Sequence, residues 1–368
     1  MPDQIHGFCD PKFQRIADIF QDNFENDLEV GASLAVAKDG EIIVDLWGGL
    51  KNADRKTPWE EDKLVLVLSS TKFPTTLCAL RLIDQGKLDP DKPIAHYWPE
   101  FAANGKDKIP VRQIFNHSTG VFCFDPPIKF SDMYDWEGTL AKLANQAPAW
   151  KPGSQSGYHG MTYGFLVGGL VHRITGLKTG EYLSSEITKP LGIDFHIGAS
   201  AKEIARMGTI IPMEIEEAEL GTLAQKAQNQ FLDPTWEDLE FISSDIPGAN
   251  GLGNGRSLAQ LAGIMAMNGT VNGYEVMSPA TVDLALTEQG YTKDAVEDIL
   301  LRWGFGFGLN SAEFECPSDE AMHWGGSGGS VLIADRKSRT SFGYAMNYMY
   351  PGFGDDHAVR GCVRGSAQ

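Results

Sequence analysis

Ser69 and Lys72, two residues that together could perform acyl transfer, stand three positions apart in the sequence. They lie between an apolar run at 64–68, which favours a strand, and a helical pattern that carries Leu77 and Leu80. Residues at this spacing share one face of a helix, and a lysine can take the proton of a serine hydroxyl when burial lowers the pKa of its amine. The pair therefore indicates a serine nucleophile with a lysine base. An S-x-x-K pattern alone is more often a helix cap followed by a surface lysine.

A glycine-rich loop at 152–160 carries Tyr158 just before a second helical pattern. A tyrosinate, or a tyrosine that shares a proton with a lysine, can act as a general base. The alternative is a loop tyrosine whose ring packs on the core. Tyr158 is thus the second candidate for proton transfer, whereas we interpret His117 and His159 as structural or pocket-lining residues.

The third candidate segment contains His323, Trp324, Gly325, Gly326 and Ser327, and it leads into an apolar β-like run. Glycine lets a ligand approach a strand edge closely, and a backbone N–H group there would stabilise an oxyanion. The alternative is a bulged edge strand. The same residues match G-x-S-x-G, the nucleophile-elbow pattern, but that elbow needs a helix after the serine. Because a strand pattern follows, we do not expect Ser327 to be the nucleophile.

The elements that must position these residues come from the whole chain. Alternating and β-branched runs predominate near both ends, whereas the middle has helical periodicity and long irregular stretches, including an acidic run at 214–219. A helix is predicted to start at Asp10 and Pro11. The predicted strands are 32–37, 41–47, 303–309, 330–334 and 341–347, and further helices are predicted at 163–174, 257–267 and 356–363.

This order of elements favours an α+β fold, because no alternation of strands and helices supports a parallel sheet. We expect an antiparallel sheet that is built from both chain ends and flanked by helices, in a domain of residues 1–75 and 255–368. Residues 76–254 are expected to form an inserted, mostly helical domain. The active site is then expected in the cleft between the two domains.

Composition excludes several classes of partner. The chain has 368 residues, a net charge of −18 and a pI near 4.8, which argues against nucleic acid and against anionic membranes or ligands. Its five cysteines are widely spaced, its histidines lack H-x-x-x-H spacing, and it contains no phosphate-binding loop, so neither metal nor cofactor is expected. With no secretion signal or long apolar run, we expect a cytoplasmic protein that acts on a small molecule. The sequence does not fix its oligomeric state.

Taken together, the three segments resemble the class C β-lactamase-like serine hydrolases, whose motifs S-x-x-K, Y-x-N and K-T-G or H-x-G occur in this order. The likeness is strongest to the family VIII carboxylesterases, whose third motif is often W-G-G. The stretches 113–120 and 249–258 are similar to further segments of the same superfamily. The resemblance spans residues 32–347 and implies a β-lactamase/transpeptidase-like fold.

The resemblance also implies roles for the candidate residues. Ser69 would be acylated, and Lys72 and Tyr158 would accept its proton and return it to the leaving group. The backbone N–H groups of Ser69 and Ser327 would form the oxyanion hole.

That second oxyanion donor depends on the alignment of the third motif. Ser327 is the donor if Trp324, Gly325 and Gly326 occupy the motif. If His323 takes its first position instead, the donor is Gly326.

Two departures from the family pattern bear on the substrate. Gly160 stands where the family has asparagine, and the third motif lacks the lysine that would meet a lactam or peptide carboxylate. An apolar Trp324 suits a neutral group instead. We therefore expect a carboxylesterase that cleaves esters of small neutral molecules. The alternatives are an acyltransferase, a β-lactamase or D-amino peptidase on the same fold and, least favoured, a binding module without turnover.

Overall fold

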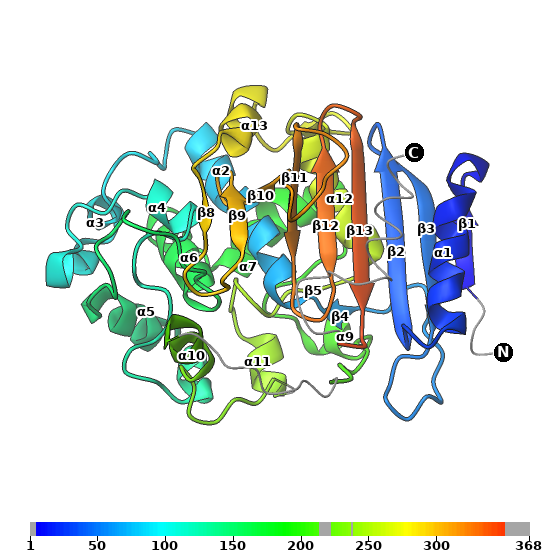
Figure 1. Cartoon of the computed structure of the whole chain (residues 1–368), viewed down its shortest axis with the longest axis horizontal. Helices are drawn as coiled ribbons and strands as arrows, with labels where there is room; N and C mark the ends of the chain where they lie inside the picture. Colours follow the sequence, from blue (N-terminus) through cyan, green and yellow to red (C-terminus); the bar gives the residue numbers. More distant parts are fainter. Residues whose placement is uncertain (1–4, 213–221, 237, 350–368) are drawn as a thin grey trace.

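A computed structural model describes residues 5–212, 222–236 and 238–349 of the chain. Within these ranges nine strands form one antiparallel sheet. They are β1 (Ile5–Cys9), β2 (Gly31–Lys38), β3 (Glu41–Gly49), β8 (Gly290–Lys293), β9 (Leu300–Trp303), β10 (Gly308–Leu309), β11 (Ala321–Gly325), β12 (Val331–Asp335) and β13 (Thr340–Met346). Their order is β1-β3-β2-β13-β12-β11-β10-β9-β8. The strands of residues 5–49 therefore meet the strands of residues 290–346 where β2 pairs with β13 (Figure 1).

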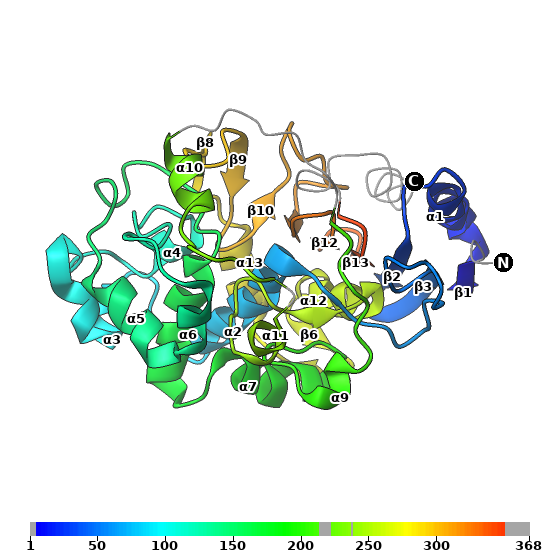
Figure 2. The ribbon, with the colours of Figure 1, turned by 90° about the horizontal axis from the view of Figure 1, so that it is seen from below.

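Helices cover both faces of this sheet because side chains alternate along each strand. Ile333 of β12 points into one apolar cluster with Phe20 of helix α1 (Gln14–Glu25). Its neighbour Leu332 points the other way, into the larger core that contains helix α12 (Gly255–Ala266). The sheet is thus the middle layer between α1 and α12, and Figure 2 shows the two helices on opposite sides of it.

Most of the remaining helices lie on the α12 side of the sheet or beyond its β8 edge, and α2 (Lys72–Asp84) lies among them (Figures 1 and 2). Helix α2 packs against α6 (Thr162–Thr175) and is buried along most of its length. The smaller pairs are β4 (Val65–Leu66) with β5 (Leu252–Gly253) and β6 (Thr270–Val271) with β7 (Tyr274–Glu275). The other helices are α3 (Ile94–Tyr97), α4 (Arg112–Phe115), α5 (Trp136–Asn145), α7 (Thr179–Leu183), α8 (Lys189–Leu191), α9 (Ala201–Ile204), α10 (Thr222–Gln228), α11 (Leu239–Ser243) and α13 (Pro279–Leu286).

The α+β prediction is confirmed, since the antiparallel sheet is built from both parts of the chain and helices flank it. Strands β2 and β3 confirm the runs at 32–37 and 41–47, and α6 and α12 confirm the two helices predicted in the middle. Strand β1 was not expected. The helix predicted at 356–363 and the acidic run at 214–219 lie outside the described residues.

The strand predicted at 303–309 is wrong, because the chain turns in the middle of that run. Gly306 has φ +83°, a conformation that glycine adopts readily, and this turn separates β9 from β10. The two phenylalanines beside it anchor the turn in the core. Phe305 stacks on Phe115 at 4.2 Å between ring centroids, and Phe307 lies 4.5 Å from Phe73. Burial of two large rings on one side therefore outweighs the β-like pattern.

Across the described ranges, no helix combines the length and the apolar character needed to span a bilayer.

Candidate active site

Ser69 lies on a tight turn between β4 and α2. The turn is a 3-10 helix, Leu68–Thr71, and Leu68 has φ +45°, which is unusual for a residue with a side chain. The Thr71 hydroxyl fixes the turn by donating to the Leu68 carbonyl at 2.5 Å and accepting from the Gly251 N–H at 2.8 Å. Thr71 is buried, whereas Ser69 remains half-buried. The turn therefore leaves Ser69 partly exposed.

Lys72 is enclosed by protein, with 1% of its surface exposed. Its Nζ lies 3.1 Å from the Ser69 Oγ and donates to the Gly248 carbonyl at 2.8 Å. Burial lowers the pKa of the amine to about 7, although the charge of Glu297 acts in the opposite direction. A lysine in this environment is largely uncharged just above neutral pH, and an uncharged amine can accept a proton.

Tyr158 joins this pair from the loop before α6. The Lys72 Nζ lies 5.0 Å from the centre of the Tyr158 ring. Burial raises the pKa of the Tyr158 phenol well above its usual value, and interactions with Ser69 and Trp324 only partly oppose this. A phenol with a raised pKa keeps its proton, so Lys72 is the group that is deprotonated first.

Asp294, which no motif in the sequence marks, holds the Tyr158 loop in position. It lies between β8 and β9 and is fully buried. Its Oδ1 accepts from the backbone N–H groups of Tyr158 and Val296 at 3.0 Å and of Glu297 at 3.1 Å, and its Oδ2 accepts from the Ser156 hydroxyl at 3.0 Å. The local bonds form a turn that an aspartate favours, but nothing in the spacing indicates the contact with Tyr158.

The third candidate segment, residues 323–327, includes the end of strand β11 and lies beside the turn that carries Ser69. Trp324 is buried, and its ring centroid lies 5.7 Å from that of Tyr158. Strand β10 pairs only with Met322 and His323, so the edge of β11 at Trp324 and Gly325 extends beyond it. His323 is buried on the other side of its strand and stacks on Phe314 at 3.6 Å between ring centroids. Trp324, rather than His323, therefore faces Tyr158.

Gly326 makes the closest approach between this segment and the Ser69 turn. A Cβ atom at this position would lie 2.2 Å from the Val67 carbonyl oxygen and 2.5 Å from the Ser330 Oγ, so only glycine fits. The Gly326 N–H donates to the Ser330 carbonyl at 2.8 Å. The Ser330 hydroxyl in turn donates to the Val67 carbonyl at 2.7 Å and lies 2.9 Å from the Ser70 Oγ. These contacts join the third segment to the turn that carries Ser69.

Ser327 is exposed, and β12 follows it where a nucleophile elbow would have a helix. The structure therefore agrees with the expectation that this G-x-S-x-G match is not an elbow.

His117 and His159 are buried next to Tyr158, where they form hydrogen bonds with the loop that carries it. The His159 N–H donates to the His117 Nδ1 at 3.0 Å, and the His159 ring lies 2.6 Å from the Thr119 Oγ1 and 2.7 Å from the Gly157 carbonyl. Burial lowers the pKa of both imidazoles, that of His159 to about 3. Both rings are therefore uncharged and bound to their neighbours.

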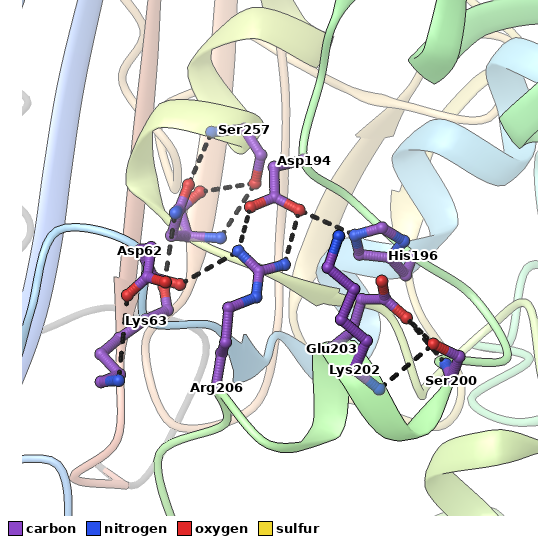
Figure 3. Close-up of polar contacts among 10 residues, drawn as sticks. Asp62, Lys63, Asp194, His196, Ser200, Lys202, Glu203, Arg206 and Ser257 are labelled. Carbon is purple, nitrogen blue, oxygen red and sulfur yellow. Dashed lines mark hydrogen bonds and ion pairs between the residues drawn. The ribbon is translucent and has the colours of Figure 1, made fainter.

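The sequence analysis also did not identify a polar network that lies beside β4 and β5. Figure 3 shows the Arg206 guanidinium directed at Asp194, with nitrogen–oxygen distances of 2.7 and 2.9 Å, and His196 at 2.8 Å from the same carboxylate. The Arg206 carbonyl accepts from the Leu64 N–H, and His196 and Leu252 exchange backbone hydrogen bonds. This network therefore braces β5 and its partner β4, and the chain passes from β4 into the turn at Ser69.

A cavity of about 370 Å³ opens beside Tyr158 and Trp324. Its wall contains Glu297, a second residue that the sequence did not indicate. Over the described part of the chain, no three His, Cys, Asp or Glu side chains are grouped so that they could hold a metal ion.

Comparison with known proteins identifies the family. Residues 20–361 match the Beta-lactamase family model. The esterase/beta-lactamase LipL of Mycobacterium tuberculosis is 28% identical over 372 residues, which cover 96% of this chain and 86% of LipL. Two solved structures have a TM-score of 0.93 and 34% identity: a family VIII carboxylesterase, with 98% of both chains covered, and a penicillin-binding protein homologue from Caulobacter crescentus, with 99% covered.

The chain therefore belongs to the beta-lactamase family and is a serine hydrolase. The resemblance inferred from its three motifs is confirmed, and carboxylesterases are among its structural neighbours.

Proposed function

We propose that this hydrolase cleaves carboxylic esters of small molecules through an acyl-enzyme on Ser69. The observation that carries the proposal is the buried Lys72 amine, 3.1 Å from the Ser69 Oγ, with its pKa lowered to about 7. As the Ser69 oxygen attacks the ester carbonyl, Lys72 takes its proton and a tetrahedral intermediate forms. The bond to the alcohol oxygen then breaks, and the acyl group stays on Ser69 until water displaces it.

Tyr158 completes the transfer of the proton. Its phenol keeps its own proton, because burial raises its pKa, and its ring lies against the Lys72 amine. In the proposed mechanism Tyr158 gives its proton to the departing alcohol oxygen and is reprotonated from Lys72. A general acid at this point prevents the release of an unprotonated alkoxide.

The negative oxygen of the intermediate would be held by the N–H groups of Ser69 and Ser327. Between the two donors compatible with the sequence, we favour Ser327 because the Gly326 N–H already donates to the Ser330 carbonyl. Trp324, and not His323, faces Tyr158, which supports the alignment that gives Ser327 this role.

The substrate class follows from what surrounds these groups. Gly160 stands where the family has an asparagine that binds the side-chain amide of a β-lactam, and Trp324 stands where a lysine would bind the carboxylate of a β-lactam or a peptide terminus. The net charge of −18 also disfavours anionic substrates. Esters of small neutral molecules fit better, and the carboxylesterase among the structural neighbours supports this choice. We further propose that the ester lies in a cleft between an α/β domain, 1–75 and 255–368, and a helical domain, 76–254.

The proposal is tested by comparing hydrolysis of p-nitrophenyl butyrate and nitrocefin by the wild type and by Ser69→Ala. We expect ester hydrolysis to exceed lactam hydrolysis, and kcat for the ester to fall by about a thousandfold or more in Ser69→Ala. Ser154→Ala, which removes an exposed hydroxyl from the loop before Tyr158, is the matched control and should retain wild-type kcat. Equal ester rates for wild type and Ser69→Ala would refute the proposal.

A further inference from the structure

The cavity beside Tyr158 and Trp324 has the size and the wall of a binding pocket. Its volume of about 370 Å³ lies within the range of small-molecule sites. Much of its wall is apolar or aromatic, with Ile299, Leu300, Leu309, Phe314 and Trp324 among the lining residues. The cavity adjoins the proposed proton donor, because Tyr158 itself lines it.

Glu297 places a carboxylate in this largely apolar wall. The turn at Asp294 fixes its position, because the Asp294 Oδ1 accepts from the Glu297 N–H at 3.1 Å. Glu297 is half-buried, and none of the described residues donates a hydrogen bond to its carboxylate or forms an ion pair with it. Burial raises the pKa of Glu297 to about 7, the charge of Asp294 adds to this, and that of Lys72 opposes it.

The other charges of the wall leave the cavity negative. Arg302 is already engaged, since its Nε donates to Glu288 at 2.8 Å and its Nη1 to the Asn310 carbonyl at 3.0 Å. Glu313 adds a second carboxylate at the outer rim, where it accepts from the Tyr291 hydroxyl at 3.2 Å. A positively charged group of a ligand would therefore meet an uncommitted carboxylate in Glu297 and the aromatic ring of Trp324 in the same wall.

We propose that this cavity receives the alcohol part of the ester and that Glu297 selects alcohols that carry a positively charged nitrogen. The inference rests on the proposed function, in which Tyr158 protonates the alcohol oxygen and Tyr158 itself lines the cavity. It extends the substrate class from neutral esters to esters of amino alcohols. Attraction between an ammonium group and Glu297 gains strength from partial burial, because the surrounding protein screens charge less than water does.

The test uses two esters of the same shape, butyrylcholine and 3,3-dimethylbutyl butyrate, which differ in one nitrogen and its charge. The release of butyric acid is measured by titration at a constant pH of about 8, where Glu297 is largely ionised, and it gives kcat/KM for both esters. We expect the wild type to prefer the choline ester, and the ratio of the two kcat/KM values to fall about tenfold in Glu297→Gln, which corresponds to about 1.4 kcal/mol. The ratio cancels any effect of the substitution on Lys72 that both esters share.

Asp298→Asn is the matched control, since Asp298 is the next residue, is exposed and pairs with Lys293 at 2.7 Å. The ratio should change less than about twofold in this variant. A wild type without preference, or a Glu297→Gln ratio equal to that of the wild type, overturns the inference while leaving the acyl-enzyme proposal intact. If Ser69→Ala hydrolyses both esters at wild-type rates, the proposed function itself is wrong.

Discussion

The two groups proposed to move protons are held in different ways. Lys72 reaches Ser69 from the same turn of chain, and the 3.1 Å contact between them follows from a spacing of three residues. Tyr158 is positioned by Asp294, which lies 136 residues away and contacts its backbone. A local arrangement can be recognised in the sequence, whereas the long-range one depends on how the hairpin of β8 and β9 packs against the helical region.

For the local contact between Lys72 and Ser69, the largest effect on the rate is expected from Lys72→Met. Methionine fills a similar volume without an amine, so kcat for p-nitrophenyl butyrate should fall by about a thousandfold or more, while the folded state tolerates an apolar group there. The measurement is kcat together with the melting temperature. A variant that keeps more than a tenth of wild-type kcat would exclude Lys72 as the base.

Lys106→Met is the matched control for that variant. Lys106 is also fully buried, but it donates to the carbonyls of Ala103, Ala144 and Gln146 rather than to a serine. Its replacement should lower the melting temperature, because three carbonyls lose a donor, and leave kcat unchanged.

The pH dependence of the rate tests the same local pair without a mutation. Lys72 is protonated, and therefore inactive as a base, below its lowered pKa of about 7. For a neutral ester, kcat/KM should rise with pH and level off above pH 7, falling by about tenfold per unit on the acidic side. A rate profile that is flat from pH 5 to 9 would contradict the assignment. In Glu297→Gln the acidic limb should move to lower pH, since the charge of Glu297 raises the pKa of Lys72.

A smaller effect is expected on the long-range side, from Asp294→Asn. The amide cannot accept all four hydrogen bonds of the carboxylate, so Tyr158 should shift and kcat should fall by about tenfold, the consequence of a small misplacement of a reacting group. If Asp294 acts through Tyr158, its substitution should have little further effect in Tyr158→Phe. Losses that simply multiply in the double variant would mean that Asp294 has an independent role.

The same contrast separates what the sequence could predict from what it could not. Ser69, Lys72, Tyr158 and Trp324 were selected from motifs, and the structure brings them together. Asp294 was not, because one aspartate in an acidic chain of 49 acidic residues has no spacing that marks it.

Two other misses have the same physical origin. Glu297 can be identified as a candidate only from the cavity that it lines, and Arg206 only from its contacts with Asp194. Periodicity also predicted one strand at 303–309, where burial of Phe305 and Phe307 bends the chain instead. In each case tertiary contacts, which a single sequence does not display, decide the outcome.

The most direct test of the central claim is to locate the covalent adduct. The enzyme is treated with a fluorophosphonate, and the modified peptide is identified by mass spectrometry in the wild type, Ser69→Ala and Lys72→Met. We predict one adduct on Ser69 in the wild type, none in Ser69→Ala, and slow formation in Lys72→Met. An adduct on Ser327, or labelling that persists in Ser69→Ala, would contradict the account.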